Sequence, residues 1–404
     1  MPGLKQPVWP QVAGVSPTCP GGFVTGPCIL TTIFFTGDEV CGRLVWGCAP
    51  GRAPFPEVRK RSMRSTRKIK GTFVGILALV AASAGGQTGS GQFFALDTVT
   101  GLDARSVKLE AAEFQGRKAV RLTTDANDGG LALLHGSDLQ DGTIEADLAV
   151  KITTPPGVRM PGFTGIAFRA KADGSEFQVF YLRPKNALAE DQGMRNHTVQ
   201  YVAEPGYGWY RLRREWPFVY ESYADIQPET WIHLKIEISG RTARIFLNGG
   251  RQPSLVVDGL KSSLLRGEVG LWGYAGEESY FANVRITPAA AQAVRNGADA
   301  AGEWTVRYSS DAGPFEGSMK LTRDGNKVSG TWSGGLGNSK SISGTWRDGY
   351  VELQFSAEWP EGRDGAPGPA TAYLEGWIDD TSAKGRMRVE GRSDGRWVAE
   401  RKLE

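Results

Sequence analysis

Cysteine is scarce in this chain and is absent from most of it. The four cysteines all lie within the first 48 residues, at Cys19, Cys28, Cys41 and Cys48. Disulfide bonds therefore cannot hold the remaining chain together. Eight, twelve and six residues separate neighbouring cysteines, whereas zinc sites typically use close C-x2–4-C pairs. The sequence predicts no zinc site.

A long hydrophobic run of the kind that spans a membrane is also missing. Residues 63–84, MRSTRKIKGTFVGILALVAASA, combine a basic start with ten apolar residues, 73–82, and a small-residue Ala82-Ser83-Ala84 end. Ten residues of helix span only about 15 Å, half of a bilayer core. This order of features is typical of a secretory signal peptide, although a short buried helix is an alternative. We expect a secreted or periplasmic protein.

Residues 1–62 show no sustained hydrophobic period, and Met63 stands where the signal peptide would start. We therefore expect 1–62 to be an N-terminal extension without a domain of its own, from a wrongly assigned start. Removal of residues 1–84 changes the formal net charge from +3 to −4. No dense lysine and arginine cluster follows, so the sequence argues against a nucleic-acid partner.

The exported part predicts an all-β protein. Alternating apolar segments recur every 8–12 residues with Gly, Asp and Asn between them, as in sandwiches and barrels. Strands are expected in the first domain, 91–287, over 143–151, 165–170, 177–183, 198–203, 231–239, 243–248, 268–273 and 279–287. An Ala-rich linker, with one or two helical turns, is expected over 288–301.

The C-terminal part, 302–404, carries a recurring G-x-W element at Gly302, Gly330, Gly344 and Gly395. Strands are expected over 303–309, 314–323, 326–333, 339–346, 349–358, 370–378, 384–391 and 396–402. Eight consecutive antiparallel strands close into an up-and-down barrel without free edges. This part resembles the small barrels of the avidin/lipocalin class, which implies a second binding or docking module.

The first domain resembles a concanavalin A-like jelly roll of the lectin, laminin-G and glucanase kind. The resemblance rests on the segments 164–169 (TGIAFR), 176–184 (EFQVFYLRP), 231–236 (WIHLKI), 243–249 (ARIFLNG), 269–272 (VGLW) and 280–284 (YFANV). Among the branches of this class, the segment is most similar to 3-keto-disaccharide hydrolase-like domains of secreted bacterial proteins. The resemblance implies a jelly-roll sandwich that binds or cleaves sugars.

The densest cluster of chemistry-bearing side chains is 207–223, with seven aromatic residues and interleaved arginines. If this segment is a strand, Trp209 and Tyr210 point to opposite faces, so one face exposes aromatic and guanidinium groups. Such groups suit the apolar faces and hydroxyl rims of sugars. The expected ligand-binding residues here are Trp209, Arg211, Arg213 and Tyr220. A packed loop over the sandwich is the alternative.

Further candidate ligand-binding residues flank a polar insertion, 185–195, between two expected strands. They are Arg183, Asn196, His197, Gln200 and Tyr201. Loops between strands often carry function, although a solvated surface is the plainer interpretation. His233, in a strand beside Trp231, is expected to be packed.

The sequence offers three candidate catalytic acids for hydrolysis, which requires two carboxylates beside the scissile bond. Glu145 and Asp147 alternate with Ile144, Ala146 and Leu148, so they share one strand face about 6.7 Å apart along the backbone. Glucanases of the resembled class carry a third acid, which would fall on Ala149 or Val150 here. A solvated strand face is therefore the plainer interpretation of Glu145 and Asp147. Glu221, the third candidate, lies beside the aromatic segment and forms a second possible pair with Asp225.

No cofactor is expected, although Asp125-Ala126-Asn127-Asp128 could supply oxygen ligands to calcium. Histidine occurs only at His135, His197 and His233, and no two of these have metal-ligand spacing. Three hypotheses about function follow: a secreted saccharide-binding protein, a glycoside or 3-keto-disaccharide hydrolase, and a cell-surface interaction scaffold without a small ligand. The sequence leaves the oligomeric state and the choice between enzyme and binder open.

Overall fold

The computed structural model describes residues 91–126, 129–154, 160–363 and 365–402. The expected N-terminal extension and signal peptide lie outside the described residues, as do residues 127 and 128 of the candidate calcium segment. Within the described part of the chain, no helix is long and apolar enough to cross a membrane.

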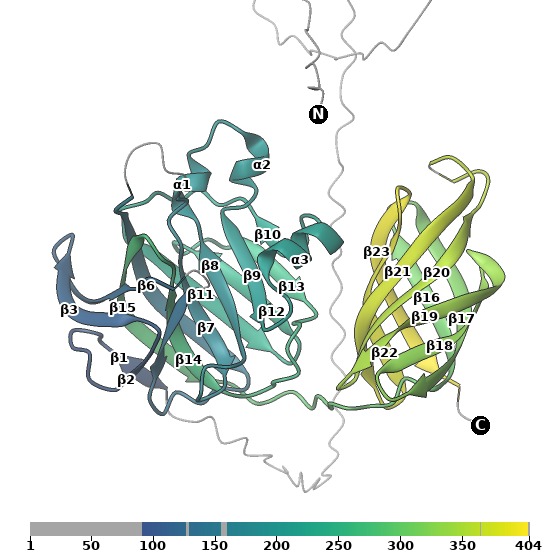
Figure 1. The fold of residues 1–404 in the computed structure, drawn as a ribbon, viewed down its shortest axis with the longest axis horizontal. Helices are drawn as coiled ribbons and strands as arrows, with labels where there is room; N and C mark the ends of the chain where they lie inside the picture. The colour runs from purple at the N-terminus through teal and green to yellow at the C-terminus, as the bar shows by residue number, and fades with distance from the viewer. Residues whose placement is uncertain (1–90, 127–128, 155–159, 364, 403–404) are drawn as a thin grey trace, which may run out of the picture. The chain divides into compact units, whose positions relative to one another are not determined.

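Residues 92–288 of the described chain contain two antiparallel sheets (Figure 1). The larger sheet contains β1 (Gln92–Phe94), β3 (Lys108–Phe114), β4 (Arg117–Thr123), β6 (Gly142–Ile152), β11 (Ile232–Ser239), β12 (Thr242–Leu247), β13 (Leu255–Asp258) and β15 (Glu277–Pro288). Its strand order is β13-β12-β11-β6-β15-β4-β3, and β1 pairs with β15. We call it the eight-stranded sheet.

The second, seven-stranded sheet contains β2 (Leu102–Arg105), β5 (Gly130–Leu134), β7 (Thr164–Ala170), β8 (Phe177–Leu182), β9 (Val199–Glu204), β10 (Glu221–Ser222) and β14 (Glu268–Gly273). Its order is β10-β9-β8-β7-β14-β5-β2. Three short helices interrupt the chain around β9: α1 (Pro184–Ala187), α2 (Gln192–Arg195) and α3 (Trp209–Glu215).

Alternation along the strands builds the core of this sandwich. On β6, Ile144 and Leu148 are fully buried, while Glu145 between them is partly exposed. From the other sheet, Phe168 of β7 and Phe180 of β8 stack with ring centroids 5.8 Å apart. Each sheet therefore has an inner face that forms the core and an outer face that is available for other contacts.

The C-terminal part is a closed antiparallel barrel. Its strands are β16 (Gly302–Ser310), β17 (Gly313–Asp324), β18 (Lys327–Gly334), β19 (Gly337–Arg347), β20 (Tyr350–Trp359), β21 (Gly368–Asp379), β22 (Ser382–Val389) and β23 (Ser393–Arg401). Each strand pairs with the next along the chain, and β23 pairs with β16 to close the barrel (Figure 1). The predicted all-β fold, a sandwich followed by an eight-stranded up-and-down barrel, is confirmed.

The G-x-W elements have a steric reason in the barrel. Trp304, Trp332 and Trp397 are almost fully buried in its core. A Cβ atom on Gly330 would lie 2.1 Å from the carbonyl oxygen of Lys320 on the neighbouring strand. The glycine lets two strands approach closely beside the large indole ring that follows.

The segment between sandwich and barrel contains no helix, contrary to the expected helical turns. Residues 289–301 have neither helix nor strand, and side-chain contacts hold them instead. Asp141 accepts a hydrogen bond from the Gln292 backbone N–H at 2.6 Å, and Trp346 donates to the Ala298 carbonyl at 2.9 Å. The sandwich and the barrel belong to one compact unit, Ala81–Glu404.

Candidate functional site

A groove with a volume of about 650 Å³ lies on the outer face of the seven-stranded sheet and beneath α3. Trp272 lies near the end of β14, Tyr274 follows that strand, and Phe163 precedes β7. Phe163 and Trp272 pack against Tyr181 of β8, with the centroids of Tyr181 and Trp272 5.0 Å apart, and Tyr274 packs against Phe163 and Trp272. The groove therefore has a wall made of aromatic rings.

Strand register explains how residues distant in sequence come to share this face. Directly paired residues of antiparallel strands present their side chains on the same face. One cross-strand row runs over the whole sheet through Arg105, Leu131, Trp272, Gly165, Tyr181, Gln200 and Glu221. A Cβ atom on Gly165 would lie 2.7 Å from that of Tyr181, so glycine here leaves room for the two flanking aromatic side chains.

Helix α3 supplies the opposite, open side of the groove. Trp209 and Tyr210 line the groove and remain 48% and 63% exposed. Arg213 lies over the Trp209 ring, with its guanidinium carbon 4.9 Å from the ring centroid, and Arg214 lies 5.5 Å from that of Tyr210. These cation–π contacts orient both rings while leaving part of each surface accessible.

The condition under which Trp209 and Tyr210 would point to opposite faces, that 207–223 is a strand, does not hold, because the central residues of this segment form α3. Leu212 and Trp216 are four residues apart and are both buried, which is the spacing of one helix face. Trp209 and Tyr210 can therefore both reach solvent, whereas a strand would send them to opposite faces. The expectation that aromatic and guanidinium groups are exposed together is met by a helix.

A buried polar cluster adjoins the groove around Glu221 of β10. Its carboxylate accepts hydrogen bonds from Arg213 at 2.7 Å and lies 2.8 Å from Nδ1 of His197 and 3.7 Å from Arg183. Gln200 accepts hydrogen bonds from Arg183 and from the Tyr181 hydroxyl, the latter at 3.0 Å. Tyr181 thus belongs to both the groove wall and this cluster.

Burial is the largest cause of the pKa shifts of Tyr181 and His197 in this cluster. It raises the pKa of the Tyr181 hydroxyl to about 12, although Arg183 acts in the opposite direction. Burial also lowers the pKa of the His197 imidazole, while the nearby Glu221 carboxylate opposes that shift. Both groups are consequently neutral above pH 7, and Tyr181 keeps the proton that it donates to Gln200.

The structure distributes the predicted ligand-binding residues over three places. Trp209 and Arg211 line the groove, and Arg211 is also paired with Glu215 and Glu352. The residues of the cluster behind the groove are Arg183, His197, Gln200 and Arg213, together with the predicted catalytic residue Glu221. Buried residues of this set support the groove wall rather than present themselves to a ligand.

The other three predicted ligand-binding residues lie outside both groups. Tyr201 points into the sandwich core, because its neighbour Gln200 on β9 takes the outer face; its hydroxyl donates to Gln178 at 2.7 Å. Asn196 ends α2 and accepts a hydrogen bond from Gln192. Tyr220 is buried toward the barrel and donates to Glu375 at 2.9 Å.

The candidate acids Glu145 and Asp147 are not brought together with Glu221. They lie on the outer face of the eight-stranded sheet, whereas Glu221 belongs to the seven-stranded sheet. Asp147 pairs with Arg117 at 2.6 Å and with His233 at 2.9 Å. His233 is half-exposed beside these acids, so the expectation that it is packed is wrong.

Sequence reasoning missed several residues that line the groove: Arg105, Phe163, Glu204, Trp272 and Tyr274. The sequence carried a usable signal for Trp272. Its neighbour Leu271 is apolar and suits the core, and adjacent strand residues face opposite sides, so Trp272 could have been placed on the outer face. Arg105 and Phe163 carried no such signal, since only the strand order brings them to this face.

No protein-family model matches the chain, and no curated relative matches it. The solved structures to which the chain is similar include the following three. The first is the carbohydrate-binding module CBM66 from Bacillus subtilis, with 18% identity over 46% of this chain and 96% of that chain and a TM-score of 0.33. The second is a Bacillus subtilis protein of unknown function with a galectin-like fold, with 12% identity over 51% of this chain and 99% of that chain and a TM-score of 0.36. The third is domain 4 of the arabinanase AbnA from Geobacillus stearothermophilus, with 13% identity over 52% of this chain and 87% of that chain and a TM-score of 0.26. At these identities, the likenesses concern the fold.

Proposed function

We propose that this chain is an exported saccharide-binding protein whose ligand lies in the groove of the seven-stranded sheet. The observation that carries the proposal is the pair Trp209 and Tyr210, which remain exposed over a groove already walled by Tyr181, Trp272 and Tyr274. Flat rings stack well on the apolar C–H faces of a sugar, and polar groups beside the rings can bind the hydroxyl groups at its rim.

Polar groups at the rim of the groove complement these rings. Arg105, Glu204 and Arg211 line the same cavity, and they can donate to or accept from sugar hydroxyl groups. A volume of about 650 Å³ lies within the usual range for small-ligand sites, about 300–1,000 Å³. A short oligosaccharide is the ligand class that fits this size and this mixture of rings and charges.

The two alternative functions draw less support from these features. Hydrolysis needs two carboxylates beside one bond. Glu145 and Asp147 share the outer face of the eight-stranded sheet, but neither lines the groove, and Asp147 is already paired with Arg117 and His233. An interaction scaffold without a small ligand would be favoured by a groove filled with the protein's own side chains. The open volume on the seven-stranded sheet instead favours binding.

The proposal can be tested by screening the mature chain on a glycan array and then titrating the best saccharide by calorimetry. Trp209→Ala and Tyr210→Ala should each weaken binding about tenfold or more, because each removes a ring that contacts the sugar. Their unfolding free energies should change by less than about 1 kcal/mol, since both side chains are largely exposed.

Phe93→Ala is the matched control. Phe93 is 54% exposed on β1 of the eight-stranded sheet, so its removal should leave affinity unchanged. If no saccharide is retained by wild type, or if Phe93→Ala weakens binding as much as Trp209→Ala, the proposal is wrong.

A further inference from the structure

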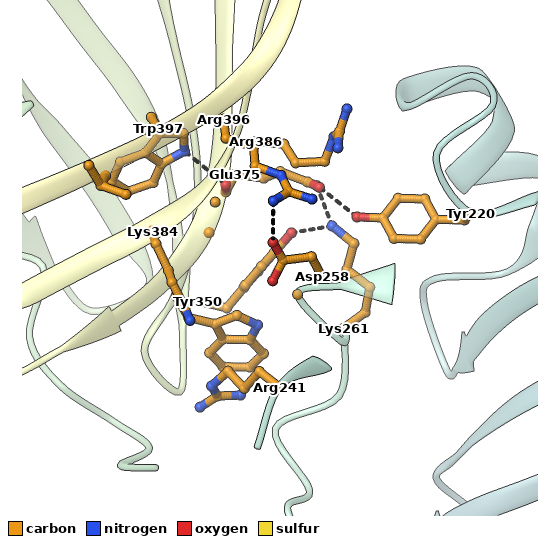
Figure 2. A pocket seen from close by; sticks show the side chains of 15 residues that line it. Tyr220, Arg241, Asp258, Lys261, Tyr350, Glu375, Lys384, Arg386, Arg396 and Trp397 are labelled. Atoms are coloured by element: carbon orange, nitrogen blue, oxygen red, sulfur yellow. Dashed lines mark hydrogen bonds and ion pairs between the residues drawn. The ribbon is translucent and has the colours of Figure 1, made fainter. Parts of the chain in front are cut away.

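A second cavity, with a volume of about 180 Å³, lies where the sandwich meets the barrel (Figure 2). None of its lining residues lines the groove. Five cationic side chains line it, Arg241 and Lys261 from the sandwich and Lys384, Arg386 and Arg396 from the barrel. This excess of positive charge over the two lining carboxylates, Asp258 and Glu375, requires an explanation.

Both carboxylates are already paired. Figure 2 shows Lys261 reaching toward Glu375 and Tyr350; the ammonium lies 2.5 Å from the Glu375 carboxylate, which also accepts a hydrogen bond from Tyr220 at 2.9 Å. Asp258 pairs with Arg396 at 3.2 Å. Two of the five cations are therefore neutralised within the cavity wall.

The other three cations, Arg241, Lys384 and Arg386, form no ion pair within 4.0 Å among the described residues. Arg241 is only 6% exposed. One of its nitrogens donates to Asn296, but its Nε and Nη1 are buried without an acceptor, as is Nε of Arg386. A buried guanidinium group with unused donors is costly unless an anion or water completes it.

The environment of Arg241 agrees with this deficit of negative charge. Its guanidinium carbon lies 3.2 Å from the ring centroid of Trp377, and burial lowers its pKa to about 9, although Asp379 at longer range raises it. The indole face holds the guanidinium group flat, which leaves its edge as the donor surface.

We propose that the junction cavity binds a small ligand that carries an oxyanion, with Arg241, Lys384 and Arg386 as its cationic partners. Guanidinium groups recognise carboxylate, sulfate and phosphate oxygens through paired hydrogen bonds. The cavity volume of about 180 Å³ lies below the usual range for drug-sized ligands, about 300–1,000 Å³, so its ligand is a single sugar acid or a free inorganic anion. Such a ligand contacts sandwich and barrel together.

The experiment is calorimetric titration of the full mature chain with three probes: galacturonate, galactose, and inorganic sulfate. Wild type should bind galacturonate or sulfate at least tenfold more tightly than galactose. Tighter binding of galacturonate identifies a sugar acid as the source of the oxyanion, and equal or tighter binding of sulfate identifies a free anion. Each bound anion should also raise the melting temperature, because it binds only the folded form.

Lys384→Gln and Arg386→Gln should each weaken anion binding about tenfold. Lys384 is exposed and Arg386 is partly exposed, so both variants should fold. Lys327→Gln, an exposed barrel lysine outside the cavity, is the matched control and should leave binding unchanged. Trp209→Ala should also leave it unchanged, which separates this site from the groove. Absence of anion binding by wild type, or equal binding by Lys384→Gln, Arg386→Gln and Lys327→Gln, would overturn the proposal.

Discussion

The core of the barrel and the groove of the sandwich use tryptophan differently. In the barrel, Trp304, Trp332 and Trp397 are almost wholly buried and form the core. In the sandwich, Trp209 is about half exposed over the groove, and Trp272 forms part of the groove wall. The same side chain therefore stabilises one part of the molecule and offers a contact surface in the other.

This difference follows from how each part closes. A small barrel turns one face of every strand inward, and that interior is filled by side chains. A sandwich buries only one face of each sheet, so the outer face of the seven-stranded sheet remains free to hold rings that the core does not need. The barrel's tryptophans should accordingly govern stability, and those of the groove should govern binding.

Replacement of a barrel tryptophan should give the largest loss of stability. Trp332 is fully buried and its ring stacks on Phe355 with centroids 4.9 Å apart. Trp332→Ala should lower the unfolding free energy by about 3–5 kcal/mol, because it leaves a large cavity. Chemical denaturation measures this. Thr331→Ala, at the exposed neighbouring position, should cost less than about 1 kcal/mol; equal losses would contradict the assignment of Trp332 to the core.

The sandwich should also show a pH dependence that originates at Glu277 of β15. Its buried carboxylate accepts hydrogen bonds from the backbone N–H groups of Gly162, at 2.7 Å, and of Phe163, a groove residue. Burial raises its pKa from 4.5 to about 7, although these hydrogen bonds oppose the shift. Between these two pH values the folded state binds more protons than the unfolded state.

This group's contribution to stability is therefore complete below pH 4.5 and is lost as the pH rises through 7, by about 3 kcal/mol in total. Denaturation at pH 5, 6, 7 and 8 should show this decline as the difference between wild type and Glu277→Gln, which carries no titrating group there. Glu278→Gln should retain the decline. A difference that is constant over this range, or that rises with pH, would refute the assignment.

Substitutions on the outer face of the eight-stranded sheet should have the smallest effects. Glu145→Gln and Asp147→Asn remove partly exposed carboxylates that pair with the half-exposed His233 and Arg117, and surface pairs contribute about 0–1 kcal/mol. We expect stability to change by no more than that, and saccharide affinity not to change. Loss of affinity in either variant, measured by calorimetry, would move the ligand to this sheet.

The barrel was largely predictable because its signals are local. Each of its eight strands alternates inward and outward residues, and turns such as 324–326 separate neighbouring strands. Consecutive pairing then requires no knowledge of distant contacts. The strands β6, β7, β8, β9, β11, β12, β14 and β15 of the sandwich were predictable by the same alternation, whereas the early strands β1 to β5 were not identified.

The candidate site was only partly predictable because it depends on strand order. Trp209 and Arg211 were identified from the density of aromatic and basic residues, but Trp272 and Arg105 come to the groove through pairings of strands distant in sequence. The helix over 209–215 was missed although Leu212 and Trp216 carry its spacing. Burial of Gln200 and Arg183 could not be deduced, because it depends on what packs above them.

The central claim is that the groove of the seven-stranded sheet holds a saccharide. A crystal structure of the protein soaked with its best glycan-array ligand tests this claim most directly. We predict a sugar ring stacked against Trp209 or Tyr210, with Trp272 beneath it. A saccharide bound to the barrel or to the eight-stranded sheet, with the groove empty at saturating concentration, would contradict the account.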